Sequence, residues 1–254
     1  MKVLDLFDLS DKKALVTGGS YGLGKAFAKA LSEAGAQVGI IDISEKLDAT
    51  IKELSSRKKK LIGIKANLAD RKDRKAAFDK FIKAFGTIDI LVNNAGITKR
   101  HPAEKFPMED WDAVMEINLN AVFDLCQMAG KVMLAKGSGK IINIASLLSF
   151  SGGLTVPAYA ASKGGVAQLT KALSNEWAGK GIHVNAIAPG YMDTPLNTAL
   201  KKDRKRVQSI IERIPAGRWG KPEDLMGAIV FLASSASDYM SGAILLVDGG
   251  FLGR

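Results

Sequence analysis

The chain of 254 residues is expected to fold as an α/β domain with a doubly wound parallel sheet. Three observations predict this fold class. Short apolar runs alternate with amphipathic stretches along the whole chain, as in repeated strand–helix units. Runs such as Ile88–Asn93 are almost continuously apolar, which is typical of strands covered on both faces. Polar or glycine-rich residues follow the strand ends, where ligands bind in such sheets.

The individual elements follow in regular alternation. About seven strands are predicted, over Ala14–Thr17, Gln37–Asp42, Lys60–Ala66, Ile88–Asn93, Lys140–Ala145, His183–Ala188 and Ala243–Val247. Helical periodicity predicts helices near residues 22–34, 45–56, 70–85, 109–136, 157–180 and 222–235. Right-handed crossovers would wind these units into one sheet. Because no Pro/Gly/Ser-rich linker or internal repeat divides the chain, residues 1–254 are predicted to form a single domain.

Composition and charge narrow the classes of function. The single cysteine, Cys126, excludes an intrachain disulfide, and with only two histidines no metal site is expected. The acidic N-terminus lacks the apolar stretch of a signal peptide, and no apolar run is long enough to span a membrane. We therefore expect a cytoplasmic protein with no membrane partner.

The net charge of +10 arises partly from two basic runs, Arg57–Lys60 and Lys201–Arg206. A basic surface attracts nucleic acids or anionic substrates. No aromatic residues are interleaved with these charges and no nucleic-acid motif accompanies them. We therefore expect no nucleic-acid partner, and the second run is more relevant to an acidic small molecule.

A glycine-rich turn joins the first predicted strand to the first helix. It runs Thr17-Gly-Gly-Ser-Tyr-Gly-Leu-Gly24, with glycines at 18, 22 and 24. Such a turn lets the backbone approach a pyrophosphate, which the free N–H groups and dipole of the following helix attract. The spacing differs from the commoner Gly-x-Gly-x-x-Gly fingerprint, and the turn could serve only as a connection. Its strand–turn–helix context favours a dinucleotide site.

Asp42 ends the second predicted strand, eighteen residues after Gly24. A carboxylate there accepts hydrogen bonds from the adenosine ribose hydroxyls and repels a 2′-phosphate. No basic residue lies in the turn or directly after Asp42, so NAD is favoured over NADP, although Lys46 is close in sequence. The alternative is that Asp42 caps the next helix, a position for which Ser44 is better placed.

Tyr159 and Lys163 lie four residues apart, and Ser146 is thirteen residues before Tyr159. On a helix, residues four apart share a face. The Lys163 cation, together with a cationic nicotinamide ring, is therefore expected to lower the tyrosine pKa from about 10 and make Tyr159 a general acid/base. Taken alone, the pair could be a chance feature of a helix surface.

With these residues in hand, the chain resembles the short-chain dehydrogenase/reductase family, which has a Rossmann-type fold, over essentially its full length. The motifs that carry the resemblance are Thr17–Gly24, Asn93-Asn-Ala-Gly96, Asn118, Ser146, Tyr159-x-x-x-Lys163 and Pro189-Gly190. Asn67 departs from the aspartate that many relatives have near the adenine.

The resemblance implies a role for each matching position. Ser146 would bind the substrate oxygen, Tyr159 would transfer its proton, Lys163 would hold the nicotinamide ribose, and Asn118 would hold a water linked to Lys163. The implied cofactor contacts are Gly18, Ser20, Tyr21, Gly22, Leu23, Gly24, Asp42, Ile43, Asn67, Leu68, Asn94, Ala95, Gly96, Tyr159, Lys163, Pro189, Gly190, Met192 and Thr194. Relatives assemble as homotetramers, so a homotetramer is expected.

A narrower resemblance, in the segments 140–146, 185–192, 213–220 and 224–239, is to those family members that interconvert a hydroxyl and a ketone on a six-carbon sugar acid. Alternatives left open are a keto-uronate reductase, a reductase of another carbonyl such as an acyl thioester or steroid, and a non-catalytic nucleotide-binding protein.

The residues near 191–215, called the lid segment below, would cover the substrate. Arginine pairs bidentately with a carboxylate. Arg100 is the first candidate to bind a substrate carboxylate, and Arg204 or Arg206 in the lid segment are the others. The alternative for the lid charges is a solvated helix face. His101, Arg218 and Trp219 are expected to pack rather than to react.

Overall fold

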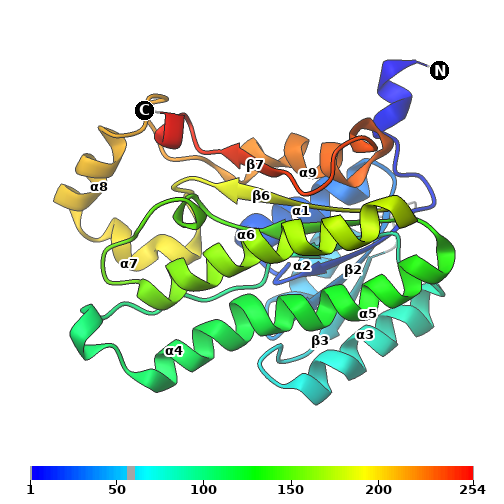
Figure 1. The fold of residues 1–254 in the computed structure, drawn as a ribbon, viewed down its shortest axis with the longest axis horizontal. Helices are drawn as coiled ribbons and strands as arrows, with labels where there is room; N and C mark the ends of the chain where they lie inside the picture. The colour runs from blue at the N-terminus through cyan, green and yellow to red at the C-terminus, as the bar shows by residue number, and fades with distance from the viewer. Residues whose placement is uncertain (1, 56–60, 254) are drawn as a thin grey trace.

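The computed structural model describes residues 2–55 and 61–253, and a single parallel sheet runs through them (Figure 1). Its strands pair in the order β3-β2-β1-β4-β5-β6-β7. Their bounds are β1 (Lys13–Thr17), β2 (Gln37–Asp42), β3 (Leu61–Lys65), β4 (Ile90–Asn93), β5 (Gly139–Ile144), β6 (Ile182–Pro189) and β7 (Ile244–Val247). The predicted doubly wound α/β fold is confirmed. Strands β1 to β3 are added toward one edge of the sheet, and strands β4 to β7 are added toward the other. The topological switch point therefore lies between β1 and β4.

Helices cover both faces of the sheet. The helices are α1 (Gly22–Glu33), α2 (Leu47–Leu54), α3 (Arg71–Phe85), α4 (Met108–Met115), α5 (Ala121–Lys136), α6 (Pro157–Trp177), α7 (Thr198–Lys201), α8 (Arg204–Ile211) and α9 (Met226–Ala233). One apolar cluster joins the sheet to α3, α5 and α6, and a second joins it to α1 and α9. Figure 1 shows α5 and α6 running side by side across one face.

The strands show why their sequences are continuously apolar. In β1, Leu15 packs in the cluster of α3, α5 and α6, whereas Ala14 and Val16 pack in the cluster of α1 and α9. All three side chains are fully buried. Because successive side chains point to opposite faces, only a strand with helices on both sides needs apolar residues at every position.

Most predicted bounds agree with the structure to within a few residues, and the exceptions have local causes. The single helix predicted near 109–136 is divided by a π-helical turn, Glu116–Asn120, between α4 and α5. Ile88 is fully buried but lies before β4 begins. The helix predicted near 222–235 starts as a 3-10 turn over Pro222–Leu225, with proline at a position where no N–H is needed, and continues as α9 from Met226. The basic run Arg57–Lys60 lies outside the described residues.

The single cysteine, Cys126, belongs to the apolar core. The side chain is fully buried in α5, and burial raises the pKa of its thiol to about 12. Within the described ranges, no helix is both long and apolar enough to cross a membrane. The lid segment contains a 3-10 turn, Pro195–Asn197, followed by the short helices α7 and α8.

Candidate active site and cofactor cleft

A cavity of about 530 Å³ opens over the carboxyl ends of the central strands. Its floor is formed by the turn after β1 and by residues after β2, β4, β5 and β6, and its outer wall comes from the lid segment. Parallel strands bring their carboxyl ends to one edge, which is why segments far apart in sequence meet here. The charged side chains that line it are Asp42, Arg100, Lys163 and Arg206.

The turn after β1 leaves no room for side chains at two of its glycines. A Cβ on Gly24 would lie 2.1 Å from the Gly18 carbonyl oxygen. A Cβ on Gly18 would lie 2.8 Å from the Ala95 Cα, and Gly18 has a φ of +65°. The first turn of α1 therefore presses against both the preceding loop and the end of β4. The result is a bare backbone surface at a helix N-terminus, which suits a pyrophosphate.

Thr17 and Asn94 tie this turn to the end of β4. The Thr17 hydroxyl accepts hydrogen bonds from the Asn94 and Ala95 N–H groups, each at 3.0 Å. The Asn94 amide donates back to the Thr17 and Gly18 carbonyls at 2.9 and 3.0 Å. These four bonds hold the two sides of the switch point in fixed register. Thr17, which was not predicted to be a site residue, owes its role to this tertiary contact.

Asp42 ends β2 with a buried carboxylate that faces the cavity. One oxygen accepts the Ser20 N–H and the other accepts the Ser44 N–H, both at 2.9 Å. Each carboxylate oxygen has two lone pairs, so each can accept a further bond from a ligand. The Ser44 hydroxyl accepts the Lys46 N–H at 3.2 Å, but α2 begins only at Leu47 and Lys46 takes the capping position, so the expected cap at Ser44 is wrong.

Ser146, Tyr159 and Lys163 meet at the other end of the cavity. Ser146 follows β5 and is hydrogen-bonded through its side chain to Tyr159, which lies in the first turn of α6. The Lys163 ammonium lies 5.7 Å from the centroid of the Tyr159 ring and donates to the Ile144 carbonyl at 2.5 Å. Pro157 begins α6, fixing where the shared face of Tyr159 and Lys163 starts.

The predicted lowering of the Tyr159 pKa by Lys163 is wrong for the protein chain alone. Burial raises the pKa of Tyr159, and the Ser146 hydrogen bond and the Arg100 charge only partly oppose it. Burial also lowers the pKa of Lys163 to about 8. The physical reason is that the Lys163 ammonium is directed to the Ile144 carbonyl, while both groups lose water.

Asn118 lies behind this cluster and does not line the cavity. It sits in the π-helical turn and is fully buried. Its oxygen accepts the Ile97 N–H at 2.9 Å, and its amide donates to the Ile97 carbonyl at 3.0 Å and to the Ser162 hydroxyl at 3.2 Å. Ser162 in turn donates to the Tyr159 carbonyl at 2.8 Å. Asn118 is thus placed to position the strand end and the helix that carry the reacting groups.

The substrate end of the cavity carries two arginines. Arg100 comes from the loop after β4 and Arg206 comes from α8, and both are partly buried. Burial, followed by the like charge of Arg206, lowers the pKa of Arg100. Among the described residues, neither guanidinium has an ion-pair partner. Arg204, the other lid candidate, is exposed and does not line the cavity.

The cavity brings together most of the predicted site residues. All of the predicted cofactor and substrate positions line it except Ser20, whose side chain is buried beneath the turn. His101 pairs with Asp110 at 2.7 Å, Arg218 pairs with Asp224, and Trp219 packs against Tyr191. Sequence reasoning missed Ser149, which accepts the Ser146 N–H and donates to the Lys163 carbonyl at 2.7 Å.

A family model described as enoyl-(acyl carrier protein) reductase matches residues 18–252. The chain belongs to the short-chain dehydrogenase/reductase family. It is accordingly an NAD(P)-dependent oxidoreductase that acts on CH–OH groups. The family match extends from the turn after β1 to the residues after β7, and so includes the whole cavity.

Relatives within this family resemble the chain over nearly its full length. A 2-dehydro-3-deoxy-D-gluconate 5-dehydrogenase from Pseudoalteromonas atlantica is 51% identical, with 99% of this chain and 100% of the relative covered. The enzyme of the same name from Escherichia coli is 49% identical, with 99% and 100% covered. The crystal structure of a gluconate 5-dehydrogenase from Burkholderia cenocepacia, in complex with NADP and tartrate, is 42% identical, covers 100% of each chain and has a TM-score of 0.95.

The residues of this chain fit the family's dinucleotide. The bare turn at Gly18 and Gly24 accommodates a pyrophosphate, and the Asp42 carboxylate retains acceptor capacity toward a ribose. Both features lie in the same cavity as Tyr159 and Lys163. The cofactor's adenosine end would therefore lie near β2 and its reactive end near α6.

Proposed function

We propose that the protein interconverts a secondary hydroxyl and a ketone on a six-carbon sugar acid, with Tyr159 as the general acid/base. The observation that carries the proposal is the convergence of three groups in one cavity. Tyr159 is hydrogen-bonded to Ser146 and lies within the electrostatic influence of Arg100. The cavity thus holds three neighbouring groups: Tyr159 as the proton donor, Ser146 as a second hydroxyl that can bind the reacting oxygen, and Arg100 as a cation that can bind a carboxylate.

The chain's own groups supply the proton chemistry. When bound, the cofactor supplies or accepts the hydride. Ser146 holds the substrate oxygen near the Tyr159 hydroxyl, which takes its proton during oxidation and returns it during reduction. Lys163, whose pKa burial lowers to about 8, lies beside the Tyr159 ring and can replenish its proton. Asn118 does not touch the reacting groups; it positions them through its hydrogen bonds to Ile97 and Ser162.

The choice of a sugar acid rests on the arginines. Arg100 lies within reach of the Tyr159 charge and has no acidic partner among the described side chains. Partial burial of a cation without an acidic partner costs desolvation free energy, and a bound substrate carboxylate would offset that cost. The relatives named for gluconate derivatives support the same substrate class.

For the cofactor, NAD is the preferred form in this proposal. Asp42 is the sole charged group that lines the adenosine end of the cavity among the described residues, and it would repel a 2′-phosphate. Lys46 is exposed and does not line the cavity. The Burkholderia relative was crystallised with NADP, so both cofactors belong in every assay.

The test of the proposal is NAD(H)- and NADP(H)-coupled turnover of 2-dehydro-3-deoxy-D-gluconate, D-gluconate, 5-keto-D-gluconate and an unsaturated-uronate-derived keto acid. We expect NAD-coupled turnover of at least one of them, and we expect Tyr159→Phe to lower kcat by about 1,000-fold, the scale of general acid–base catalysis. Tyr239→Phe is the control, because Tyr239 is fully exposed and loses the same hydroxyl.

Two results would overturn the proposal. If Tyr159→Phe kept most of the wild-type kcat, the proton-transfer role would be wrong. If no sugar acid reacted while NADH still bound, the substrate would belong to another carbonyl class, such as an acyl thioester or a steroid. A protein that bound NADH and turned over neither class would be a nucleotide-binding protein.

The expected homotetramer is also part of the proposal. Phe123 on α5 and Leu246 on β7 are each 43% exposed. β7 ends the sheet, so its outer edge has no strand beside it among the described residues. An exposed aromatic side chain on a helix and an open edge strand favour association between copies. Light scattering on the purified protein should give four times the chain mass, and a monomer would refute the assembly.

A further inference from the structure

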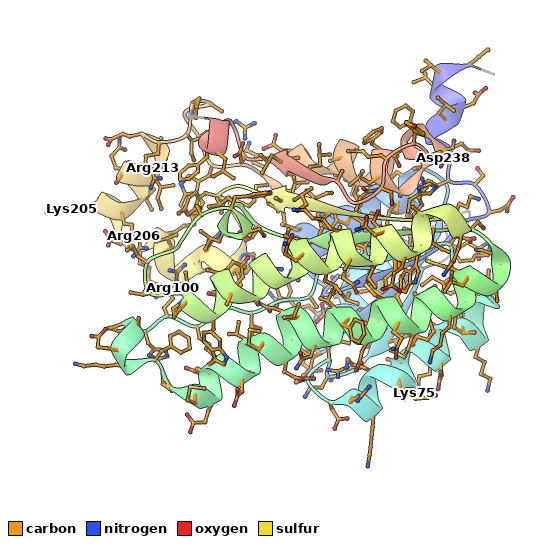
Figure 2. The ribbon with its side chains drawn as sticks, viewed as in Figure 1. Lys75, Arg100, Lys205, Arg206, Arg213 and Asp238 are labelled. Carbon is orange, nitrogen blue, oxygen red and sulfur yellow. The ribbon has the colours of Figure 1, made fainter. Side chains whose placement is uncertain are left out.

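We infer that Arg206 is a specificity-determining residue, which closes α8 onto the carboxylate of the substrate opposite Arg100. This inference rests on the proposed sugar-acid function and deepens it. We call the pair Arg100 and Arg206, with a carboxylate bound between them, the clamp. The clamp would make the position of the lid segment depend on whether the substrate is an acid. Figure 2 shows Arg100 and Arg206 at the same end of the molecule, approaching from different elements.

Arg100 and Arg206 lie in segments that are held by different hydrogen bonds. Arg100 follows β4, in a loop that is tied to the segment before α6 by the hydrogen bond from the His101 N–H to the Thr155 carbonyl at 3.1 Å. Arg206 lies in the first turn of α8, where the Asp203 carboxylate accepts its N–H at 3.0 Å. The Asp203 cap satisfies the backbone of Arg206 and leaves its guanidinium free to face the cavity.

The other lid charges are either paired or directed elsewhere. Lys201 pairs with Asp193. Arg213 stacks over the Phe251 ring, with its guanidinium carbon 4.5 Å from the ring centroid. Lys205 is exposed, and Figure 2 shows it at the outer side of α8. Of the lid cations that the structure describes, Arg206 is the one that lines the cavity.

The charges of Arg100 and Arg206 explain why a carboxylate would draw α8 toward the cavity. Two guanidinium groups that line one cavity repel each other, and their mutual charge contributes to the lowered pKa of Arg100. Repulsion opposes approach of α8 while no anion is present. A single carboxylate between them adds two attractions that outweigh the remaining repulsion, and guanidinium groups bind carboxylates bidentately. A neutral polyol of the same length provides no such gain.

Movement of α8 would be transmitted to the reacting groups. Ile210 of α8 is buried in a cluster with Leu147, Leu200, Ile214 and Phe251. Leu147 directly follows Ser146, whose hydroxyl accepts the Leu148 N–H at 3.1 Å. The clamp therefore reaches the substrate-binding serine through packed side chains, so carboxylate binding at Arg206 is expected to affect kcat as well as KM.

The experiment compares Arg206→Gln, Arg206→Lys and Lys205→Gln. Lys205→Gln removes the same charge from the same helix without touching the cavity, so it controls for long-range attraction of the anion. With the best sugar acid and its neutral polyol counterpart, we expect Arg206→Gln to raise KM for the acid about 30-fold, the loss of one charge-assisted hydrogen-bond pair. Arg206→Lys should recover part of it, and Lys205→Gln should change KM less than about threefold.

A second readout follows the lid directly. Hydrogen exchange of residues 196–211 is measured in the NADH complex, with and without D-gluconate or its neutral polyol. The acid should protect α8 in wild type and in Lys205→Gln, and the polyol should not. Loss of this protection in Arg206→Gln supports the clamp even where kinetics are slow.

The outcomes separate the two proposals. If sugar acids react and Arg206→Gln behaves like Lys205→Gln in both readouts, the clamp is refuted and the proposed function stands. If no sugar acid reacts but D-gluconate protects α8 only when Arg206 is present, the clamp stands as an anion site and the proposed reaction is refuted. If no sugar acid of the panel reacts and D-gluconate does not protect α8, both are refuted.

Discussion

The cofactor cradle, formed by the turn after β1 with Asp42 and Asn94, and the lid segment line the same cavity but are built differently. Bonds between side chains and backbone fix the cradle: four of them join the Thr17–Gly18 segment to Asn94 and Ala95. The lid segment has helices of four and eight residues that rest on a small apolar cluster. The difference indicates that the cradle is preformed, while the lid depends on what it covers.

The largest effect is expected where the cradle has no space. Gly24→Ala places a Cβ 2.1 Å from the Gly18 carbonyl oxygen, so the backbone that binds the pyrophosphate must shift. We expect at least about a 100-fold loss of NADH affinity and about 2 kcal/mol loss of stability, the scale of overpacking. Isothermal titration and urea unfolding measure both.

Gly227→Ala in α9 is the control for this substitution. Gly227 also lies in a helix, but a Cβ there would meet nothing within 4 Å. Alanine should stabilise that helix by about 0.5–1 kcal/mol and leave NADH binding unchanged. Wild-type NADH affinity in Gly24→Ala would show that the cradle adapts as readily as the lid, and the comparison would fail.

The contrast between the two regions also explains what could be predicted from the sequence. The cradle was predictable because each of its features is local: glycines at fixed spacing, a carboxylate at a strand end and a helix after the turn. The catalytic cluster was predictable from the helical spacing of Tyr159 and Lys163 together with the family resemblance. The layers of the fold followed from apolar runs that only a sheet covered on both faces requires.

What could not be predicted depends on tertiary placement. The sequence presents Arg204, Lys205 and Arg206 in succession, and nothing local says which one faces the cavity. The π-helical turn at Asn118 follows from packing against Ile97 rather than from propensity. The pKa of Tyr159 rises because burial outweighs nearby charge, a balance that spacing alone does not reveal.

The buried Lys163, at the opposite end of the cavity from the cradle, should give the protein a pH-dependent stability. Burial lowers the pKa of Lys163 to about 8 in the folded chain, from 10.5. Below pH 8 both states are protonated and the folded state bears the full cost of the buried charge. Above pH 8 the folded state loses its proton while the unfolded state keeps it, so stability rises with pH.

Lys163→Met removes this cost, so the variant should be more stable than wild type at pH 7 by about 2 kcal/mol, after allowance for the lost bond to Ile144. The difference should shrink toward pH 9.5. Urea unfolding at both pH values measures it. Lys205→Met, which removes an exposed lid cation, should show a difference that stays within about 0.5 kcal/mol at both. A constant gap for Lys163→Met would contradict the assigned burial.

The smallest effect compares two aspartates that both accept backbone N–H groups. Asp42 accepts Ser20 and Ser44 in the cradle, and Asp203 accepts Arg206 at the start of α8. Asp42→Ala should raise the ratio of kcat/KM with NADP to that with NAD about tenfold, because it removes a ribose acceptor and a repulsive charge. Asp203→Ala removes a helix cap of about 1 kcal/mol, so it should raise KM for the sugar acid and leave the cofactor ratio unchanged.

If Asp203→Ala altered the cofactor ratio as strongly as Asp42→Ala, the cradle and the lid would act as one unit. A selective response would instead assign cofactor choice to the preformed region and substrate choice to the adaptable one.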